Sequence, residues 1–193
     1  MSADVPSVIL TGPAMIPLVG AAAALEAEDI PPFAVIGGVA VTARLGRAVR
    51  ATADLDAVTD QRYTPTALEV LRARDDAIYD AADPHTIRIA GAEVQFQEVE
   101  PVDDADVSHL DDKDLLYVAA HAHALAAATP VRLVAAHERI EATVPVATTG
   151  ALLATKLHAY LDRRRVAGPD KRPGDLWDIY NVLTQYDVGV IAP

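Results

Sequence analysis

The segment from residue 33 to residue 58 constrains the fold of this chain more than any other. Two short apolar stretches enclose a Gly-Gly pair, and the second stretch carries two aspartates, which is the order strand, turn, helix, strand. Side chains two apart in a strand point to the same face, so Asp54 and Asp56 lie side by side. Carboxylates this close repel each other, and a divalent cation such as Mg²⁺ (or Mn²⁺) relieves the repulsion. The pattern therefore predicts a metal-binding pair at Asp54 and Asp56.

The glycine pair strengthens this interpretation. Gly37 and Gly38 follow an apolar strand and precede a helix that we expect at residues 39–45. Glycine allows backbone N–H groups to approach a ligand closely, and a helix N-terminus favours an anion. A phosphate cradle beside a metal-binding pair indicates chemistry on a nucleoside triphosphate. The alternative is a tight turn beside a solvated Asp-x-Asp edge, which would be the better interpretation of either motif alone.

The same residues resemble a known family. The glycine pair and the stretch RATADLD at 50–56 are similar to the signature of the polymerase-β-type nucleotidyltransferases. More narrowly they resemble the AbiEii-type toxins of bacterial type IV toxin–antitoxin and phage-defence systems, and the MenT-type toxins. Two later stretches stand in the same order as in that family, KLHAYLDR at 156–163 and DLWDI at 175–179. The resemblance spans residues 33–183.

The resemblance implies an α/β (α+β) fold with a polymerase-β-like nucleotidyltransferase core, a mixed sheet and a C-terminal helical portion. We expect the core at 1–105 and a mainly helical lobe at 106–193 that completes the active site, with one compact domain as the alternative. The implied enzyme moves a nucleoside monophosphate from a nucleoside triphosphate to an acceptor hydroxyl. The implied acceptor is RNA, at a tRNA 3′ end, and the implied role is a toxin held by an antitoxin protein. Alternatives are transfer to a protein or small molecule, and a catalytically degenerate interaction module.

The resemblance also implies roles for individual residues. The catalytic set would be Asp54, Asp56, Lys156, Asp175 and Asp178, and of the last two we favour Asp175. The nucleotide-binding set would be Gly37, Gly38, Arg47, Arg50, Thr52, Lys156 and Arg163. Elementary alternatives exist: a surface lysine for Lys156, a helix cap for Asp175 and a strand former for Thr52. The superfamily usually has a third carboxylate on a neighbouring strand, where this chain has Gln95 and Gln97, and this departure favours the degenerate alternative.

Composition limits the remaining possibilities. The chain has no cysteine, so a disulfide or a thiolate metal site is excluded. Its net charge of −12 argues against nucleic-acid binding by the whole surface. Two local basic clusters could still hold a phosphate chain: Arg44, Arg47 and Arg50, and then Arg163, Arg164, Arg165, Lys171 and Arg172. No signal peptide or membrane span is evident, so we expect a cytoplasmic protein.

Periodicity and turn residues predict the remaining elements. We expect helices at 15–28, 39–45, 65–79, 114–128, 152–165 and 173–183, and strands at 33–36, 54–58, 86–90 and 93–99. One or two strands, broken by Pro145, are expected at 131–146, a linker at 100–112, a loop at 168–170, and a helix cap at Thr148 or Thr149. Leu153, Leu157 and Leu161 are expected to face the core, as are Trp177 and Tyr180. His121 and His123 should diverge, and His158 should pack or be exposed.

Overall fold

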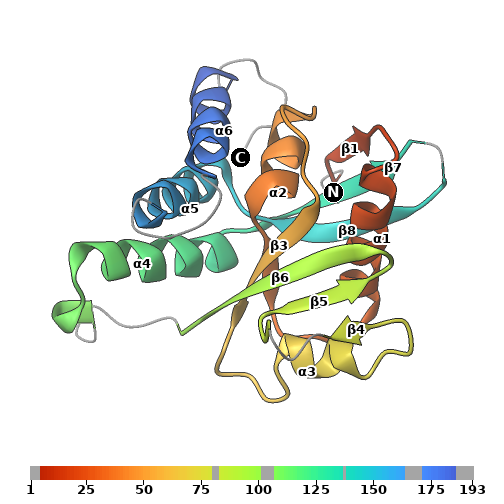
Figure 1. Ribbon diagram of the computed structural model, residues 1–193, viewed down its shortest axis with the longest axis horizontal. Coiled ribbons are helices and arrows are strands. Elements are labelled where there is room, and N and C mark those ends of the chain that lie inside the picture. The colour runs from red at the N-terminus through yellow and green to blue at the C-terminus, as the bar shows by residue number, and fades with distance from the viewer. Residues whose placement is uncertain (1–4, 80–82, 101–106, 137, 164–170, 186–193) are drawn as a thin grey trace.

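A computed structural model describes residues 5–79, 83–100, 107–136, 138–163 and 171–185. Its centre is an eight-stranded mixed sheet in the order β1-β7-β8-β2-β3-β6-β5-β4 (Figure 1). The strands are β1 (Ser7–Leu10), β2 (Phe33–Val35), β3 (Asp54–Asp60), β4 (Ile78–Tyr79), β5 (Thr86–Ile89), β6 (Ala92–Val99), β7 (Thr129–Ala135) and β8 (Glu141–Val146). This architecture confirms the expected α/β fold with a mixed sheet.

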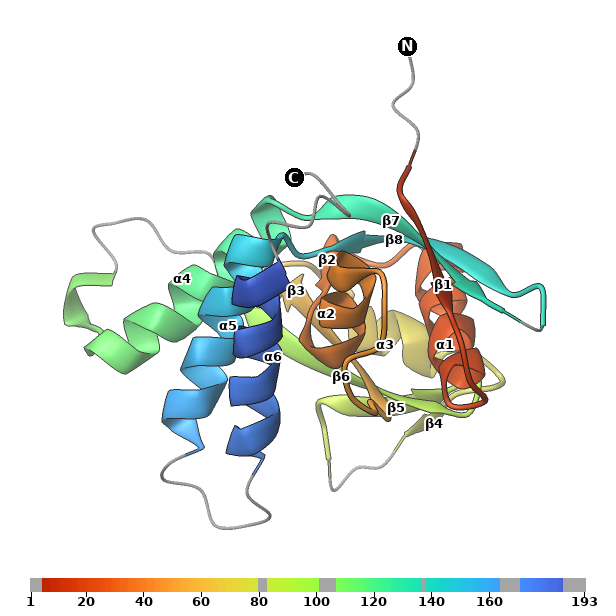
Figure 2. The ribbon, with the colours of Figure 1, turned by 90° about the horizontal axis from the view of Figure 1, so that it is seen from above.

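Six α-helices and one short 3₁₀ helix accompany the sheet in the described ranges. They are α1 (Met15–Ala27), α2 (Gly37–Leu45), α3 (Ala67–Arg72), η1 (Val107–His109), α4 (Asp112–Ala126), α5 (Thr149–Asp162) and α6 (Arg172–Gln185). α1 packs against strands across the sheet, whereas α4, α5 and α6 gather at one end of it (Figure 1). Seen from above, α5 and α6 run side by side and α2 lies next to them (Figure 2).

Strand register determines which side chains meet. β3 and β6 are parallel neighbours, with Asp54 opposite Glu93 and Asp56 opposite Gln95. Alternation places Leu55 and Phe96 on the other face, where both are almost completely buried in the core. The polar face of β3 and β6 is covered in part by α4, which packs against both strands. The two aspartates therefore lie between the sheet and the C-terminal helices.

Several expected elements differ in the structure. The helix expected at 65–79 is only α3, because a capping box between Thr66 and Glu69 starts it and the chain turns into β4 at Ile78. β1 was not expected. Pro145 does not break its strand, because it lies inside β8 opposite Pro130 of β7, so neither ring removes a needed N–H from that pair. Thr148 is the cap of α5.

Two predictions of buried faces are wrong. Leu157 and Leu161 are exposed, whereas Lys156 beside them is buried. Trp177 and Tyr180 are half exposed and stack on each other with ring centroids 5.7 Å apart. The physical reason is that α5 and α6 meet through ion pairs, in which Lys156 contacts Asp175 and Asp178. The helix turn that buries Lys156 directs the adjacent Leu157 to solvent, whereas Leu152 stays in the core.

Some expectations fall outside the described residues. These are residues 101–106 of the linker, which contain the expected boundary at 105/106, as well as Arg164, Arg165 and the loop at 168–170. β7 and β8 come from the expected C-terminal lobe but pair within the same sheet as β2. In the part of the chain that the structure describes, no helix combines the length and apolar character needed to cross a membrane.

Candidate active site

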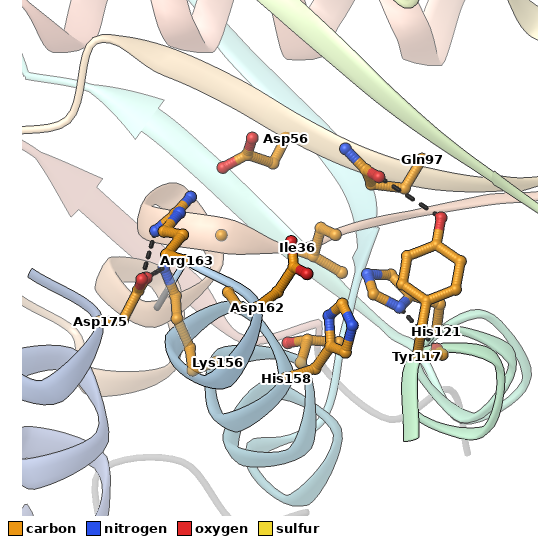
Figure 3. Close-up of a pocket in the computed structure, with 13 residues that line it drawn as sticks. Ile36, Asp56, Gln97, Tyr117, His121, Lys156, His158, Asp162, Arg163 and Asp175 are labelled. Carbon is orange, nitrogen blue, oxygen red and sulfur yellow. Dashed lines mark hydrogen bonds and ion pairs between the residues drawn. The ribbon is translucent and has the colours of Figure 1, made fainter. Parts of the chain in front are cut away.

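A pocket of ≈ 250 Å³ opens where the sheet, the start of α2 and helices α4, α5 and α6 meet. Figure 3 shows charged side chains on one side of it and aromatic rings on the other. Its lining residues are Ile36, Gly37, Asp56, Gln97, Tyr117, His121, Thr155, Lys156, His158, Ala159, Asp162, Arg163 and Asp175. Five residues of the expected site, Gly37, Asp56, Lys156, Arg163 and Asp175, thus line one cavity.

Gly37 lies against Asp56. Its φ is +68°, a left-handed conformation that side-chain-bearing residues rarely adopt. A Cβ at Gly37 would lie 1.8 Å from Asp56 Oδ2, so no larger residue fits while the carboxylate stays in place. Gly38 lies against Thr52, and a Cβ added at Gly38 would be 2.7 Å from Thr52 Oγ1. The glycine pair therefore makes room for the polar side chains of the Thr52–Asp56 segment.

Asp56 lies where its negative charge is disfavoured. Burial at the pocket and repulsion from Asp54 raise the pKa of Asp56 from 3.8 to about 6, although the charges of Lys156, Arg163 and Lys171 oppose the rise. Thr52 is buried, and its hydroxyl donates to Asp54 Oδ1 at 3.4 Å, which holds that carboxylate beside its neighbour. The pair therefore carries more negative charge than its surroundings balance.

This donor set fits Mg²⁺. Mg²⁺ prefers hard oxygen ligands and is usually bound by one or two carboxylates together with substrate phosphates. Within the described residues no third His, Cys, Asp or Glu completes a metal-binding group. Gln95 lies opposite Asp56 in the register, as the sequence pattern indicates, and Glu93 lies opposite Asp54. Glu93 accepts a hydrogen bond from Gln95 at 2.6 Å and lies 3.9 Å from Arg88. The carboxylate pair is thus left for a cation and a substrate to complete.

Lys156 connects α5 to α6. Its Nζ lies 3.4 Å from Asp175 Oδ1 and 2.9 Å from Asp178 Oδ2, and its side chain is only 10% exposed. Arg163, two turns further along α5, also bonds to Asp175. Lys156 is therefore not a surface lysine. The spacing of seven residues places both cations on the face of α5 that borders the pocket.

Asp175 and Asp178 have different surroundings. Asp175 lines the pocket and contacts two cations that line it too. Asp178 has no exposed surface and forms two hydrogen bonds, each 2.9 Å long, with the guanidinium of Arg50. Asp178 is thereby saturated by Arg50 and Lys156, whereas Asp175 borders the space where a substrate fits. This geometry favours Asp175 as the acid at the site and Asp178 as a residue that positions Lys156.

The arginines near α2 do not form one exposed basic cluster. Arg44 is buried and donates to the carbonyl oxygens of Val146 and Ala147. Arg47 lies beyond the C-terminal end of α2, opposite to the glycine pair, and donates to Gln185 at 3.1 Å. Arg50 is half-buried against Asp178. Of these three arginines, Arg47 is the most exposed to solvent.

The aromatic side of the pocket was missed by the sequence analysis. Tyr117 and His121 come from α4 and His158 from α5; the Tyr117 centroid lies 4.3 Å from that of His121 and 5.1 Å from that of His158. The Tyr117 hydroxyl donates to Gln97 Oε1 at 3.4 Å. His121 and His123 do diverge, since His123 is exposed. The available signal was the spacing of four between Tyr117 and His121, which places both on one helix face.

Comparison with known proteins identifies the family of this chain. The profile of the nucleotidyl transferase AbiEii toxin family, which describes type IV toxin–antitoxin systems, matches residues 21–191. This chain belongs to that family. It is therefore an enzyme, a nucleotidyltransferase of a toxin–antitoxin family, and this result favours the enzyme over the interaction module. No match was found among curated proteins.

One solved structure shares the fold of this AbiEii-family chain, and two others are similar at lower TM-scores. The crystal structure of ANT(2″)-Ia in complex with adenylyl-2″-tobramycin aligns over 90% of both chains, with a TM-score of 0.51 and 13% identity. The solution structure of ANT(2″)-Ia has a TM-score of 0.47 and 17% identity, covering 92% of this chain and 85% of that one. A nucleotidyltransferase-like protein from Paracoccidioides brasiliensis has a TM-score of 0.47 and 18% identity, covering 88% and 74%.

Proposed function

We propose that this chain transfers a nucleoside monophosphate from a nucleoside triphosphate to a hydroxyl of RNA, at a tRNA 3′ end, in a Mg²⁺- or Mn²⁺-dependent reaction. The observation that carries the proposal is the pocket in which Asp56, Gly37, Lys156, Arg163 and Asp175 meet. Carboxylates beside a glycine turn and two cations form a site for a metal-bound triphosphate. The biological role that follows is a toxin whose activity an antitoxin partner restrains.

The charged residues at the pocket and Asp54 beside it each have a role in the proposed reaction. Asp54 and Asp56 would hold Mg²⁺, whose positive charge activates the acceptor hydroxyl and offsets charge on the transferring phosphoryl group. Lys156 and Arg163 bind phosphate oxygens, and Asp175 orients both cations because it contacts both.

The bond changes balance with these groups alone. The acceptor oxygen bonds to the α-phosphorus while the bond from that phosphorus to its bridging oxygen breaks. Pyrophosphate leaves with the electron pair, and the hydroxyl proton passes to solvent water. The cations next to the pocket stabilise the negative charge on the departing pyrophosphate.

The net charge of −12 favours a second candidate, in which the acceptor hydroxyl belongs to a protein or a small molecule. An acidic surface repels an RNA backbone, so RNA has to be bound by local cations against the field of the whole molecule. The expected localisation in the cytoplasm is compatible with either acceptor.

Labelled nucleoside triphosphates distinguish the candidates. The purified chain is incubated with each of the four labelled triphosphates, Mg²⁺ and either total bacterial RNA or total protein. We expect label in the RNA fraction, with tRNA as the labelled species, and none with the Asp56→Asn variant. Label only in protein would favour the second candidate, and no label in any fraction would contradict the proposed reaction.

A further inference from the structure

The aromatic side of the pocket has no role in the reaction proposed above. Tyr117, His121 and His158 pack against one another at the end of the cavity away from Lys156 and Arg163 (Figure 3). The His121 and His158 centroids are 6.1 Å apart with an interplanar angle of 81°, so the rings are not a flat stack. Tyr117 and His158 are only half-buried, which leaves part of each ring open to the pocket.

Two polar atoms accompany these rings. His121 Nδ1 donates to the carbonyl oxygen of Tyr117 at 2.7 Å, so in the neutral ring Nε2 carries the lone pair. Gln97 accepts from the Tyr117 hydroxyl through Oε1, which leaves its amide Nε2 as a donor. Among the residues that the structure describes, neither His121 Nε2 nor Gln97 Nε2 has a hydrogen-bond partner, and both residues line the pocket. The aromatic side thus offers one acceptor and one donor in addition to ring surface.

We propose that Tyr117, His121 and His158 form the subsite for the base of the incoming nucleoside triphosphate, with Gln97 at its edge. The inference rests on the proposed function, because it assumes that the triphosphate lies at Lys156 and Arg163. A nucleotide has an anionic end and a flat neutral end, and the pocket has a cationic end and an aromatic end. Bases stack on aromatic side chains irrespective of their sequence, and His and Tyr both serve this purpose.

The electrostatics of the rings agree with a neutral ligand. Burial lowers the pKa of His121 and of His158, so both imidazoles are uncharged at neutral pH. Burial also raises the pKa of Tyr117, which keeps its phenol protonated. The charges that act on His158 are those of Asp162 and Asp114, which raise its pKa, and of Lys113, which lowers it, and Lys113 pairs with Asp162 at 2.6 Å. Glu98 is the charge that acts on Tyr117, and it raises the pKa of the phenol further. A triphosphate would gain nothing from these rings, whereas a base would.

His158 offers the sharpest test because it is half-buried and its replacement leaves α4 intact. Equilibrium binding to the full chain is measured for each nucleoside triphosphate and for inorganic tripolyphosphate, which has no base. We expect His158→Ala to weaken nucleoside triphosphate binding by roughly 5- to 150-fold, the range for the loss of one base–aromatic stack. Tripolyphosphate binding should be unchanged, and His158→Phe, which keeps a flat ring, should retain most of the affinity.

Leu157→Ala is the matched control, since Leu157 is adjacent on α5 and points to solvent outside the pocket. It should bind every ligand as the unchanged chain does. Equal weakening for tripolyphosphate and nucleotides would overturn the subsite, and so would unchanged nucleotide binding in both His158→Ala and Tyr117→Ala. An effect on acceptor affinity alone would also overturn it, by assigning the rings to an acceptor base. If the unchanged chain bound nucleotides but incorporated no label, the proposed reaction would fail while the subsite stood.

Discussion

At the scale of the residue, Asp56 carries a charge that its surroundings disfavour. Asp56→Asn keeps the shape of the side chain and removes the charge, so we expect it to abolish nucleotidyl transfer while the fold remains intact. When a chelator removes divalent metal, the variant should be more stable than the unchanged chain at pH 7 by about 1 kcal/mol. One pKa unit corresponds to about 1.4 kcal/mol, and the partial exposure of the carboxylate reduces the full effect. Denaturant unfolding monitored by circular dichroism measures this difference.

The sign of the pH dependence follows from the raised pKa of Asp56. Between 3.8 and about 6 the folded chain retains a proton that the unfolded chain has lost, so stability falls as pH rises through this window. The gain from Asp56→Asn should therefore be small at pH 4 and complete above pH 6. Asp60→Asn is the control of opposite sign, because hydrogen bonds from Arg62 lower the pKa of Asp60. A gain that did not change with pH would contradict the assignment.

Lys156→Ala should affect both stability and substrate binding. The lysine is buried between Asp175 and Asp178, so its removal leaves two buried carboxylates with one cation each, at a cost of about 1 to 3 kcal/mol. Loss of a charge-assisted contact to phosphate should also weaken nucleoside triphosphate binding. Lys113→Ala, at an exposed pair with Asp162, should change stability by no more than about 1 kcal/mol. Unchanged nucleotide affinity in Lys156→Ala would remove Lys156 from the phosphate site.

At the scale of the element, the turn from β2 into α2 determines whether the site can form. Gly37→Ala adds a Cβ where Asp56 Oδ2 lies and strains a backbone with φ of +68°, so either the carboxylate or the turn must move. We expect a loss of stability of about 1 to 3 kcal/mol and loss of transfer. Gly150→Ala in α5 meets nothing within 4 Å and should be neutral or slightly stabilising. Wild-type transfer by Gly37→Ala would show that this close approach is unimportant.

Elements with a strong local signal could be predicted, and those that depend on partners could not. The glycine pair, the Asp-x-Asp strand and the hairpin of β5 and β6 follow from local residues. β1 forms because it pairs with β7 across more than 100 residues of sequence, which no local pattern reveals. The faces of α5 were misassigned because leucine is expected inside and lysine outside. Here Lys156 is buried by Asp175 and Asp178, which belong to another helix.

At the scale of the whole molecule, the pocket combines what the sequence could and could not reveal. Asp56, Lys156 and Asp175 could be grouped from motif order. Tyr117 and His158 could not, because their meeting depends on how α4 docks against α5. Likewise, the three arginines near α2 are close in sequence but end in different surroundings, since Arg44 and Arg50 find acceptors on β8 and α6.

The charge of the whole molecule provides the last prediction. If the acceptor is RNA, the chain has to bind its backbone through local cations despite a net charge of −12. Each phosphate that a cation neutralises releases counterions, so activity on RNA should fall steeply as salt rises. Arg47→Gln removes a cation beside α6 and the pocket-forming helices, and it should flatten that salt dependence without changing the Mg²⁺ requirement. Initial rates on tRNA from low to physiological salt measure the slope.

Arg132→Gln is the matched control for this experiment. Arg132 is also exposed and held by one hydrogen bond, here to Ser7, but it lies on β7 beside β1, which is an edge strand of the sheet. Arg132→Gln removes the same net charge beside β1 and not beside α6. If both variants reduced the salt dependence of activity equally, only the net charge of the molecule would matter. If the activity of the unchanged chain did not depend on salt, a protein or small-molecule acceptor would be favoured. A smaller slope for Arg47→Gln alone would locate the RNA backbone beside α2 and α6, because only there would a lost cation leave a phosphate unpaired.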